Sequence, residues 1–178
     1  MKVKVSIIYS WFIRIITYFL PNLPIIMRFR GFLYSLMMKE CGKNFQVTSS
    51  TIINSLAGLI VGRDVYIGSN TIIIAVDLII ENEVLIGPSC VISGGNHTFS
   101  NGSFRFGPSL SSSILISEGS WVAANCTITA GSVLPPRSIL AANAVLSSKF
   151  NKSDCLYAGI PAKFIKEINE NNLFTPIF

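Results

Sequence analysis

The chain has 178 residues, half of them hydrophobic, and a formal net charge of +5. This length suits one domain, and the hydrophobic content excludes a disordered chain, apart from the tail from about residue 170. The basic residues gather toward both ends without the dense basic stripe of a nucleic-acid-binding protein, so we expect no nucleic-acid partner. We interpret the charge as serving a membrane surface at the N-terminus and a phosphate-bearing ligand near the C-terminus.

Residues 1–40 form an apolar and basic segment. Its basic residues are Lys2, Lys4, Arg14, Arg28, Arg30 and Lys39, and the first acidic residue is Glu40. The longest uncharged run, residues 15–27, is too short for a membrane-spanning helix, which needs about 20 residues. We expect a helical segment with two open roles: a cap or subunit-packing element, or an interfacial anchor on an anionic membrane.

A six-residue aliphatic repeat occupies residues 41–151. The hexads begin at Val47, Ile53, Val61, Ile67, Ile73, Ile80, Ile86, Ile92, Ile116, Val122, Ile128, Leu134, Leu140 and Leu146. Their fifth positions are mostly small or β-branched, and the exceptions are Asp77, Asn96 and Phe150. A chain that turns a corner every six residues buries both positions inside a narrow prism, so the repeat predicts an all-β hexapeptide solenoid. The alternative, a β-sandwich, follows a period of two and would not keep this phase.

The four cysteines lack metal-site spacing, and the chain has one histidine, so we expect no metal site. Cys90 and Cys126 fall at fifth positions of hexads, where we expect buried, reduced packing residues. Nothing in the pattern requires an oxidising compartment. We therefore expect a cytoplasmic protein, with peripheral contact at the inner membrane face through residues 1–40.

The repeat breaks after His97, and the next clear hexad starts at Ile116. Between them lies a polar, glycine-bearing loop excursion, residues 98–115, with three phenylalanines. Solenoids eject such loops at corners, often on a binding face. Because histidine accepts a proton near neutral pH, and because His97 follows Gly94 and Gly95 at the root of the loop, His97 is the candidate catalytic residue. Beyond the repeat, residues 152–178 are expected to form a cap with a short C-terminal helix, and a tail.

Several segments together carry a resemblance to a known family. They are the repeat, the pair Asn96-His97 before a loop, residues 116–128, and the closing run Ala-Gly-Ile-Pro-Ala-Lys at 158–163. Over about residues 41–168 the chain resembles the hexapeptide-repeat sugar and polysaccharide O-acetyltransferases. The resemblance implies a left-handed parallel β-helix and a homotrimer with active sites between subunits. It also implies direct acetyl transfer from acetyl-CoA to a sugar hydroxyl of a glycan or polysaccharide precursor, with His97 as general base and no metal.

The resemblance also implies a set of cofactor-binding residues. They are Ala124, Ala142, Ser147, Ser148 and Lys163, with Lys166 as a substitute for Lys163. The alanines would line the groove for the pantetheine arm, and Lys163 would meet the adenosine phosphate. Ser147 and Ser148 depart from the Thr-Lys pair that family members often carry. Each residue also has a structural interpretation: the alanines as corner residues, and Lys163 as a solvated lysine at the start of a helix.

The candidates for acceptor binding are Asn70, Asp77 and Asn96. Asn70 resembles an acceptor-contacting asparagine of related enzymes, and Asp77 could orient His97 or bind a sugar hydroxyl. Both are also ordinary turn residues. Trp121 resembles an aromatic residue of the family, although packing under the loop explains it equally well.

Other functions share parts of this pattern. A γ-type carbonic anhydrase shares the solenoid but needs three histidines for zinc, and this chain has one. A noncatalytic β-helix acting as a scaffold or binding protein stays open, and so does an acetyltransferase for a small non-sugar acceptor. The acceptor itself is hypothesised to be a lipid-linked glycan, because an apolar, basic N-terminus suits work at a membrane face.

Overall fold

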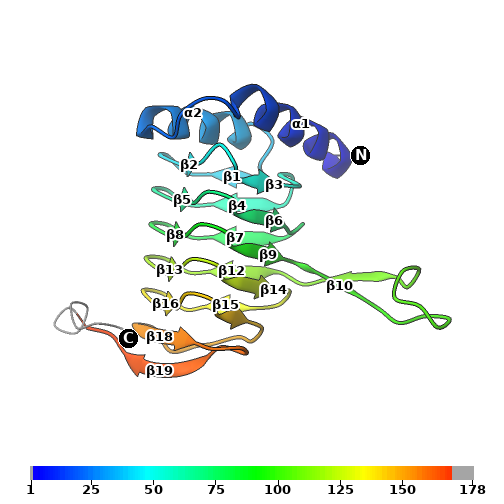
Figure 1. Cartoon of the computed structure of the whole chain (residues 1–178), viewed down its shortest axis with the longest axis vertical. Helices are drawn as coiled ribbons and strands as arrows, with labels where there is room; N and C mark the ends of the chain where they lie inside the picture. Colours follow the sequence, from blue (N-terminus) through cyan, green and yellow to red (C-terminus); the bar gives the residue numbers. More distant parts are fainter. Residues whose placement is uncertain (1, 170–178) are drawn as a thin grey trace.

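The three-dimensional structure, a computed structural model, describes residues 2–169. Two helices, α1 (Lys2–Thr17) and α2 (Pro24–Ser35), precede a left-handed parallel β-helix with three faces (Figure 1). Face A consists of β1 (Glu40–Cys41), β4 (Leu59–Val61), β7 (Leu78–Ile80), β12 (Ile114–Ile116) and β15 (Val133–Leu134). Face C consists of β3 (Ile52–Ile53), β6 (Ile72–Ile74), β9 (Val91–Ser93), β14 (Thr127–Thr129) and β17 (Val145–Leu146).

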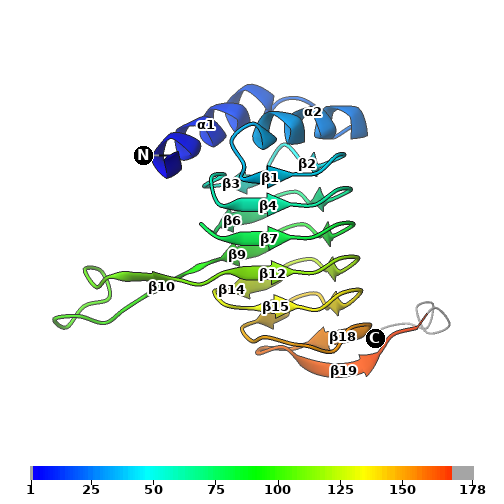
Figure 2. The ribbon, with the colours of Figure 1, turned by 180° about the vertical axis from the view of Figure 1, so that it is seen from behind.

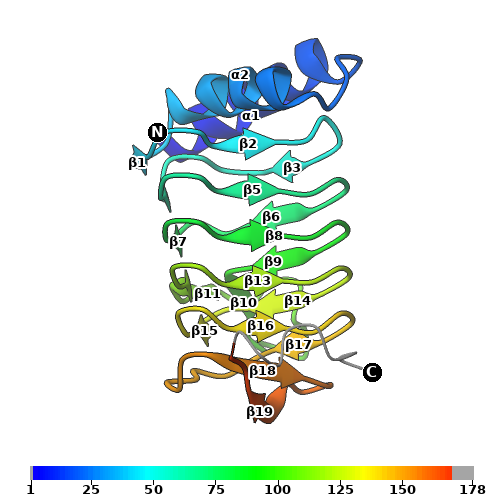
Figure 3. The same ribbon diagram turned by 90° about the vertical axis from the view of Figure 1, so that its left-hand side faces the viewer.

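Face B runs along the third side of the prism. Its parallel strands are β2 (Gln46–Val47), β5 (Tyr66–Ile67), β8 (Leu85–Ile86), β13 (Trp121–Val122), β16 (Ile139–Leu140) and β18 (Cys155–Ala158). Figure 3 shows these strands stacked one above another. Each coil contributes one short strand to each face, and the chain turns at corners that we call A–B, B–C and C–A.

The interior of the prism follows the predicted repeat. All fourteen hexad starts are buried, with at most 2% of any of them exposed. The fifth positions are buried too, apart from Ala57 and the three exceptions Asp77, Asn96 and Phe150. Phe150 stacks on Tyr157 with ring centroids 4.1 Å apart, and so covers the core at its C-terminal end. The period of six therefore predicted both the fold and its core.

The excursion predicted at residues 98–115 does leave the solenoid, but it belongs to a two-stranded arm rather than to an irregular loop. β10 (Gly95–His97) pairs antiparallel with β11 (Ser109–Ser111), and the arm projects far from the solenoid (Figure 2). At its tip Asn101 and Gly102 both have positive φ, of 50° and 75°, and Ser100 bridges Ser103. Asn-Gly is a strong hairpin signal, so the sequence held a clue that favoured a ribbon over a loop.

The expected C-terminal helix is wrong within the described residues. β19 (Lys163–Glu167) is a strand that pairs antiparallel with β18. The last coil leaves an unpaired strand edge, and a strand satisfies its backbone groups where a helix could not. Part of the expected tail, residues 170–178, lies outside the described residues.

The helices close the other end of the solenoid. Along face B from β5 to β16, the last carbonyl of each strand accepts a hydrogen bond from an N–H of the preceding coil. One example is the bond from Thr48 N–H to Ile67 O. Val47 occupies the equivalent place in the first coil, where no earlier coil precedes it among the described residues, and buried Arg30 donates to its carbonyl instead (2.6 Å). On face C the hydroxyl of Ser10 does the same for Ile53 O. The helices therefore serve as the cap that a solenoid end requires.

Candidate active site

His97 is the last residue of β10, on the arm rather than at a corner of the solenoid. Its main chain pairs with Ser109, and its side chain is exposed. Across the part of the chain that the structure describes, no hydrogen bond reaches the imidazole ring. Its ring nitrogens are therefore available to a group that arrives from outside the chain.

The backbone beside His97 is held in place by contacts across the arm. The hydroxyl of Thr98 donates to Pro108 O at 2.6 Å. The two sides approach so closely at Gly107 that a Cβ there would lie 1.9 Å from Thr98 O. Only glycine fits this position without moving the chain, so the arm fixes where His97 stands.

A hollow of about 280 Å³ lies where the arm leaves the solenoid. Its lining comes from α1, the C–A corner and both strands of the arm: Val3, Ile7, Asn54, Ser55, Ile74, Ala75, Val76, Gly94, Gly95, Ser109, Leu110 and Ser111. Aliphatic side chains and glycines predominate in this wall. The hollow is therefore better suited to an apolar group than to a sugar.

The three acceptor candidates are not brought together. Asp77 is exposed at the C–A corner below the arm, where its carbonyl accepts Ile114 N–H (3.2 Å). Asn96 is exposed on the arm beside His97. Asn70 has a left-handed φ of 60° and lies at the B–C corner, one face of the prism away. Of the three candidates, only Asp77 and Asn96 share the region of the arm.

Ala124 and Ala142 stack at the B–C corner of successive coils, as Asn143 N–H donating to Ala124 O shows (3.0 Å). Ala124 is half-buried and Ala142 is exposed. Neither alanine N–H has a hydrogen-bond acceptor within residues 2–169, and each alanine is followed by an asparagine in the left-handed region. In the coil before them the equivalent residue is Pro88, which has no N–H to offer. The family resemblance suggested the alanines as candidates, whereas the free N–H groups appear only in the structure.

The remaining cofactor candidates divide between two corners. Lys163 begins β19 opposite Ala158, and β18 stacks on β16 just before the corner of Ala142. Lys163 is exposed and therefore stands near the end of the alanine column. Ser147 and Ser148 follow β17 at the C–A corner, the same corner that carries the arm. Lys166 is half-buried opposite Leu156 in the terminal hairpin.

Trp121 does not pack under the arm. It lies on face B, whereas the arm leaves between β9 of face C and β12 of face A (Figure 1). Trp121 lines a separate hollow of about 500 Å³ with Arg137 and Asp154, whose side chains form an ion pair (2.6 Å). The packing interpretation of Trp121 is therefore wrong.

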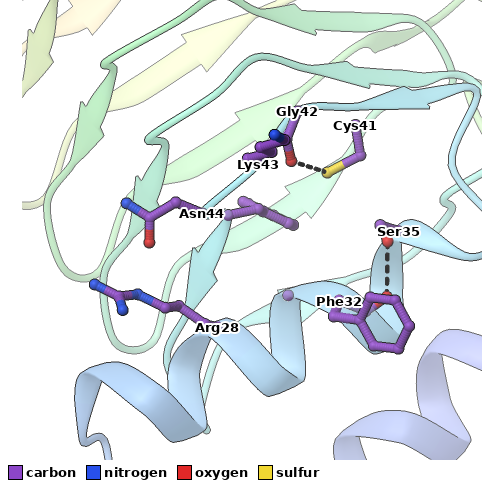
Figure 4. A pocket seen from close by; sticks show the side chains of 9 residues that line it. Arg28, Phe32, Ser35, Cys41, Gly42, Lys43 and Asn44 are labelled. Carbon is purple, nitrogen blue, oxygen red and sulfur yellow. Dashed lines mark hydrogen bonds between the residues drawn. The ribbon is translucent and has the colours of Figure 1, made fainter.

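A further hollow, of about 690 Å³, separates α2 from the first coil (Figure 4). Arg28, Phe32 and Lys43 are among its lining residues. It lies at the helical end of the molecule, far along the chain from the arm. Burial raises the pKa of Cys41, which also lines it, to about 11, so its thiol is uncharged near neutral pH.

Cys90 and Cys126 are interior packing residues, as predicted. Both are at most 1% exposed, and their Sγ atoms donate to the carbonyls of Ala123 (3.1 Å) and Ala141 (3.0 Å). The hydrogen bond with Cys90 and burial raise the pKa of the Cys126 thiol. Among residues 2–169, no three histidine, cysteine or acidic side chains gather as a metal site.

The sequence matches no protein-family profile and no curated protein. Solved structures do match its fold. A hexapeptide-repeat-containing acetyltransferase of Vibrio cholerae O1 biovar eltor, complexed with acetyl coenzyme A, aligns with a TM-score of 0.80 at 19% identity, over 94% of this chain and 89% of that one. A galactoside acetyltransferase in complex with coenzyme A gives 0.82 at 20% identity, over 95% and 84%.

A maltose O-acetyltransferase from Clostridium difficile 630 aligns with a TM-score of 0.76 at 17% identity, over 94% of this chain and 88% of that one. At these identities the likeness concerns the fold. It includes the helical N-terminal part as well as the coils, because nearly the whole chain is covered. In fold, the protein is a left-handed hexapeptide β-helix of the kind found in hexapeptide-repeat acetyltransferases.

Proposed function

We propose that the protein is an O-acetyltransferase that moves an acetyl group from acetyl-CoA to a sugar hydroxyl. The observation that carries the proposal is the pairing of an exposed histidine on a fixed arm with a column of free main-chain N–H groups on the solenoid. The histidine serves as proton acceptor, and the column of N–H groups offers hydrogen-bond donors to the carbonyl oxygens of an amide-bearing ligand. The three solved acetyltransferases above share the fold that carries both.

The B–C corner suits the pantetheine arm of acetyl-CoA. Ala124 and Ala142 place only methyl groups beside their N–H donors, so an extended ligand can lie close to the backbone. Lys163 near the end of the column supplies a positive charge for a phosphate. Ser147 and Ser148 lie one corner away, and their hydroxyls are proposed to meet the ligand where it crosses toward an arm.

The proposed reaction is a direct transfer. His97 removes the proton from the acceptor hydroxyl as its oxygen attacks the thioester carbonyl, and a main-chain N–H stabilises the tetrahedral oxyanion. When the carbon–sulfur bond breaks, the imidazolium returns its proton to the leaving thiolate. General-base assistance typically contributes about 10²- to 10⁴-fold, and an oxyanion donor about 10²- to 10³-fold.

Asp77 and Asn96 are proposed to contact the acceptor from the side of the arm, and Asn70 from the solenoid. The acceptor is proposed to be a glycan or polysaccharide precursor, in its lipid-linked form. Incubation with labelled acetyl-CoA and a panel of free sugars, nucleotide sugars and lipid-linked oligosaccharides tests this. Acetylation of a free amino acid in preference to every glycan would refute the sugar assignment.

We further propose a homotrimer with its sites between subunits. The arm that carries His97 leaves at the C–A corner and projects away from the column of Ala124 and Ala142 at the B–C corner. One subunit therefore presents the two halves of the site on different sides. A cyclic assembly can bring the arm of one copy to the column of the next.

Mixed assemblies test this arrangement. His97→Ala removes the base, and Ala142→Trp blocks the column; each variant alone should be inactive. If the sites lie between subunits, a refolded equal mixture should regain about a quarter of the wild-type sites, because one interface in four combines an intact arm with an intact column. Mixtures that stay inactive, with the trimer mass confirmed by light scattering, would refute the shared site.

The catalytic role of His97 has its own test. His97→Ala should lower kcat by about 10²- to 10⁴-fold while leaving the affinity for coenzyme A unchanged. Turnover at the wild-type rate would refute the assignment. The rival function, a noncatalytic scaffold, has no reason to bind coenzyme A, so a calorimetric titration that shows no binding up to millimolar concentration would favour it.

A further inference from the structure

Helix α1 is amphipathic, but its polar side faces the protein and its apolar side faces outward, the reverse of an ordinary surface helix. Its buried residues are Ser6, Ser10, Ile13 and Thr17, three of them hydroxyl-bearing. The Ser6 hydroxyl accepts a hydrogen bond from Leu56 N–H (3.3 Å), and the Ser10 hydroxyl donates to Ile53 O. The open end of the solenoid presents backbone groups that need polar partners, so the polar side of the helix must face inward.

The opposite side of α1 is consequently apolar and exposed. We call twelve exposed apolar residues of the two helices, their connection and the end of α2 the end face: Val5, Ile8, Trp11, Phe12, Ile15, Ile16, Phe19, Leu23, Ile25, Phe29, Phe32 and Leu36. Ile8 is 67% exposed and Ile25 is 73% exposed. Monomeric proteins rarely leave so many large apolar side chains together in water, and such a patch usually marks a binding surface.

Helix α2 has a mixed inner side. Its buried residues are Met27, Arg30, Gly31 and Tyr34, which include a charged side chain. A Cβ at Gly31 would lie 1.9 Å from Phe45 O, so the helix is pressed against the first coil on that side. The apolar Phe29 and Phe32 remain on the outer side. Both helices lie across the end of the solenoid, and their outer sides form the end of the molecule (Figures 1 and 2).

The charges around the end face identify its occupant. No acidic residue occurs among residues 2–39, whereas Lys2, Lys4, Arg28 and Lys39 are exposed and Arg14 is half-buried. Arg28 also shares a hollow with Lys43 of the first coil, beside Phe32 (Figure 4). A second copy of this face would bring like charges together, so self-association is disfavoured. An anionic surface with an apolar interior satisfies both the charges and the apolar side chains.

We propose that the end face docks the protein on an anionic lipid bilayer, with α1 and α2 lying in the interface. Neither helix among the described residues is long and apolar enough to cross a membrane, which agrees with an interfacial position. The inference extends the proposed function, because docking would present the arm to a lipid-linked acceptor, and it does not depend on acetyl transfer. In the proposed cyclic trimer the three end faces lie on the same side and can meet one membrane together.

Vesicle co-sedimentation tests the proposal with the full-length protein. Wild type should bind vesicles that contain phosphatidylglycerol, and salt should weaken the binding. Ile8→Asp and Phe29→Asp should each lower the affinity about tenfold or more. Ile165→Asp is the matched control: Ile165 is 53% exposed at the opposite end of the molecule, and its variant should bind like wild type.

The charges are tested separately. A Lys2→Gln, Lys4→Gln double variant should lose about thirtyfold in affinity for the anionic vesicles, at roughly fivefold per basic residue, and little for pure phosphatidylcholine. Trp11 supplies a direct readout, because the chain has two tryptophans and Trp121→Phe leaves Trp11 alone. Its emission should shift to the blue on binding and be quenched by brominated lipids.

Three results would overturn the proposal: no binding of wild type to anionic vesicles, equal loss of binding in Ile165→Asp, or association of wild type into larger oligomers that Ile8→Asp abolishes. The last result would assign the face to a second copy of the chain. Circular dichroism of each variant establishes that it is folded. Because the vesicle assay contains no acetyl-CoA, its failure is distinguishable from failure of the proposed enzymatic function.

Discussion

Arg30 connects the helical cap to the first coil, and its replacement tests the capping argument. The side chain is fully buried. Its guanidinium donates to Val47 O (2.6 Å), to Thr17 O (3.1 Å) and to the hydroxyl of Thr17 (3.1 Å). Burial lowers the pKa of this group, and no carboxylate within residues 2–169 forms an ion pair with it. The bonds to the first coil and to the end of α1 are therefore its main compensation.

Arg30→Met keeps the apolar stem and removes these donors. Thr17 O still accepts Leu20 N–H (3.2 Å), but Val47 O is left without a partner in a buried position. An orphaned buried acceptor costs about 1–3 kcal/mol, and the loss of a positive charge at the C-terminal end of a helix costs about 0.3–1 kcal/mol. With the bonds to Thr17 included, we expect the free energy of unfolding to fall by about 2–4 kcal/mol. For a chain of this size the melting temperature should fall by roughly 4–16 °C.

Equilibrium urea unfolding followed by circular dichroism measures the change. Arg28→Met is the matched control, because Arg28 lies on the same helix but is exposed, and its variant should stay within about 0.5 kcal/mol of wild type. If Arg30→Met were as stable as Arg28→Met, the carbonyl of Val47 would have another partner. The explanation given for the helical cap would then fail.

The remaining predictions concern the arm, the C-terminal end and the interior. Gly107→Ala should lower activity without a comparable loss of thermal stability, because its Cβ would collide with Thr98 O beside His97 but outside the core; an active variant, measured by acetyl transfer, would show that the arm tolerates the shift. The hydrogen bond to Arg137 holds the pKa of Asp154 below its ordinary value of 3.8, so this pair contributes stability above about pH 4 and loses it as the pH falls through the lowered pKa. Asp154→Asn should remove that part of the acid dependence of unfolding, and an unchanged profile would contradict the assignment. Buried Cys126 should react with a water-soluble thiol reagent only after unfolding, and fast labelling of the native protein, located by mass spectrometry, would contradict its interior position.

The solenoid could be predicted from the sequence because its contacts repeat. Every coil packs only on its neighbours, so the same burial requirement recurs at each corner and leaves a period of six in the chain. The three fifth-position exceptions also had structural meaning: Asp77 and Asn96 are exposed near the arm, and Phe150 covers the end of the core. The arm and the C-terminal strand β19, which the sequence did not predict as strands, fall where the repeat no longer determines the backbone partner. In both places a strand edge decided the outcome by pairing with a second strand.

The sequence by itself determined the all-β solenoid, its buried aliphatic columns and the single histidine at the break. Only the tertiary structure decided that Ala124 and Ala142 offer free N–H groups at one corner while Ser147 and Ser148 lie at the next. It also decided that α1 turns three hydroxyl-bearing side chains inward, that Arg30 of α2 is buried, and that Trp11, Phe12, Phe29 and Phe32 are exposed. The physical reason is that the repeat records which side chains enter the core, whereas the orientation of a cap depends on backbone groups that the open end of the solenoid leaves unpaired.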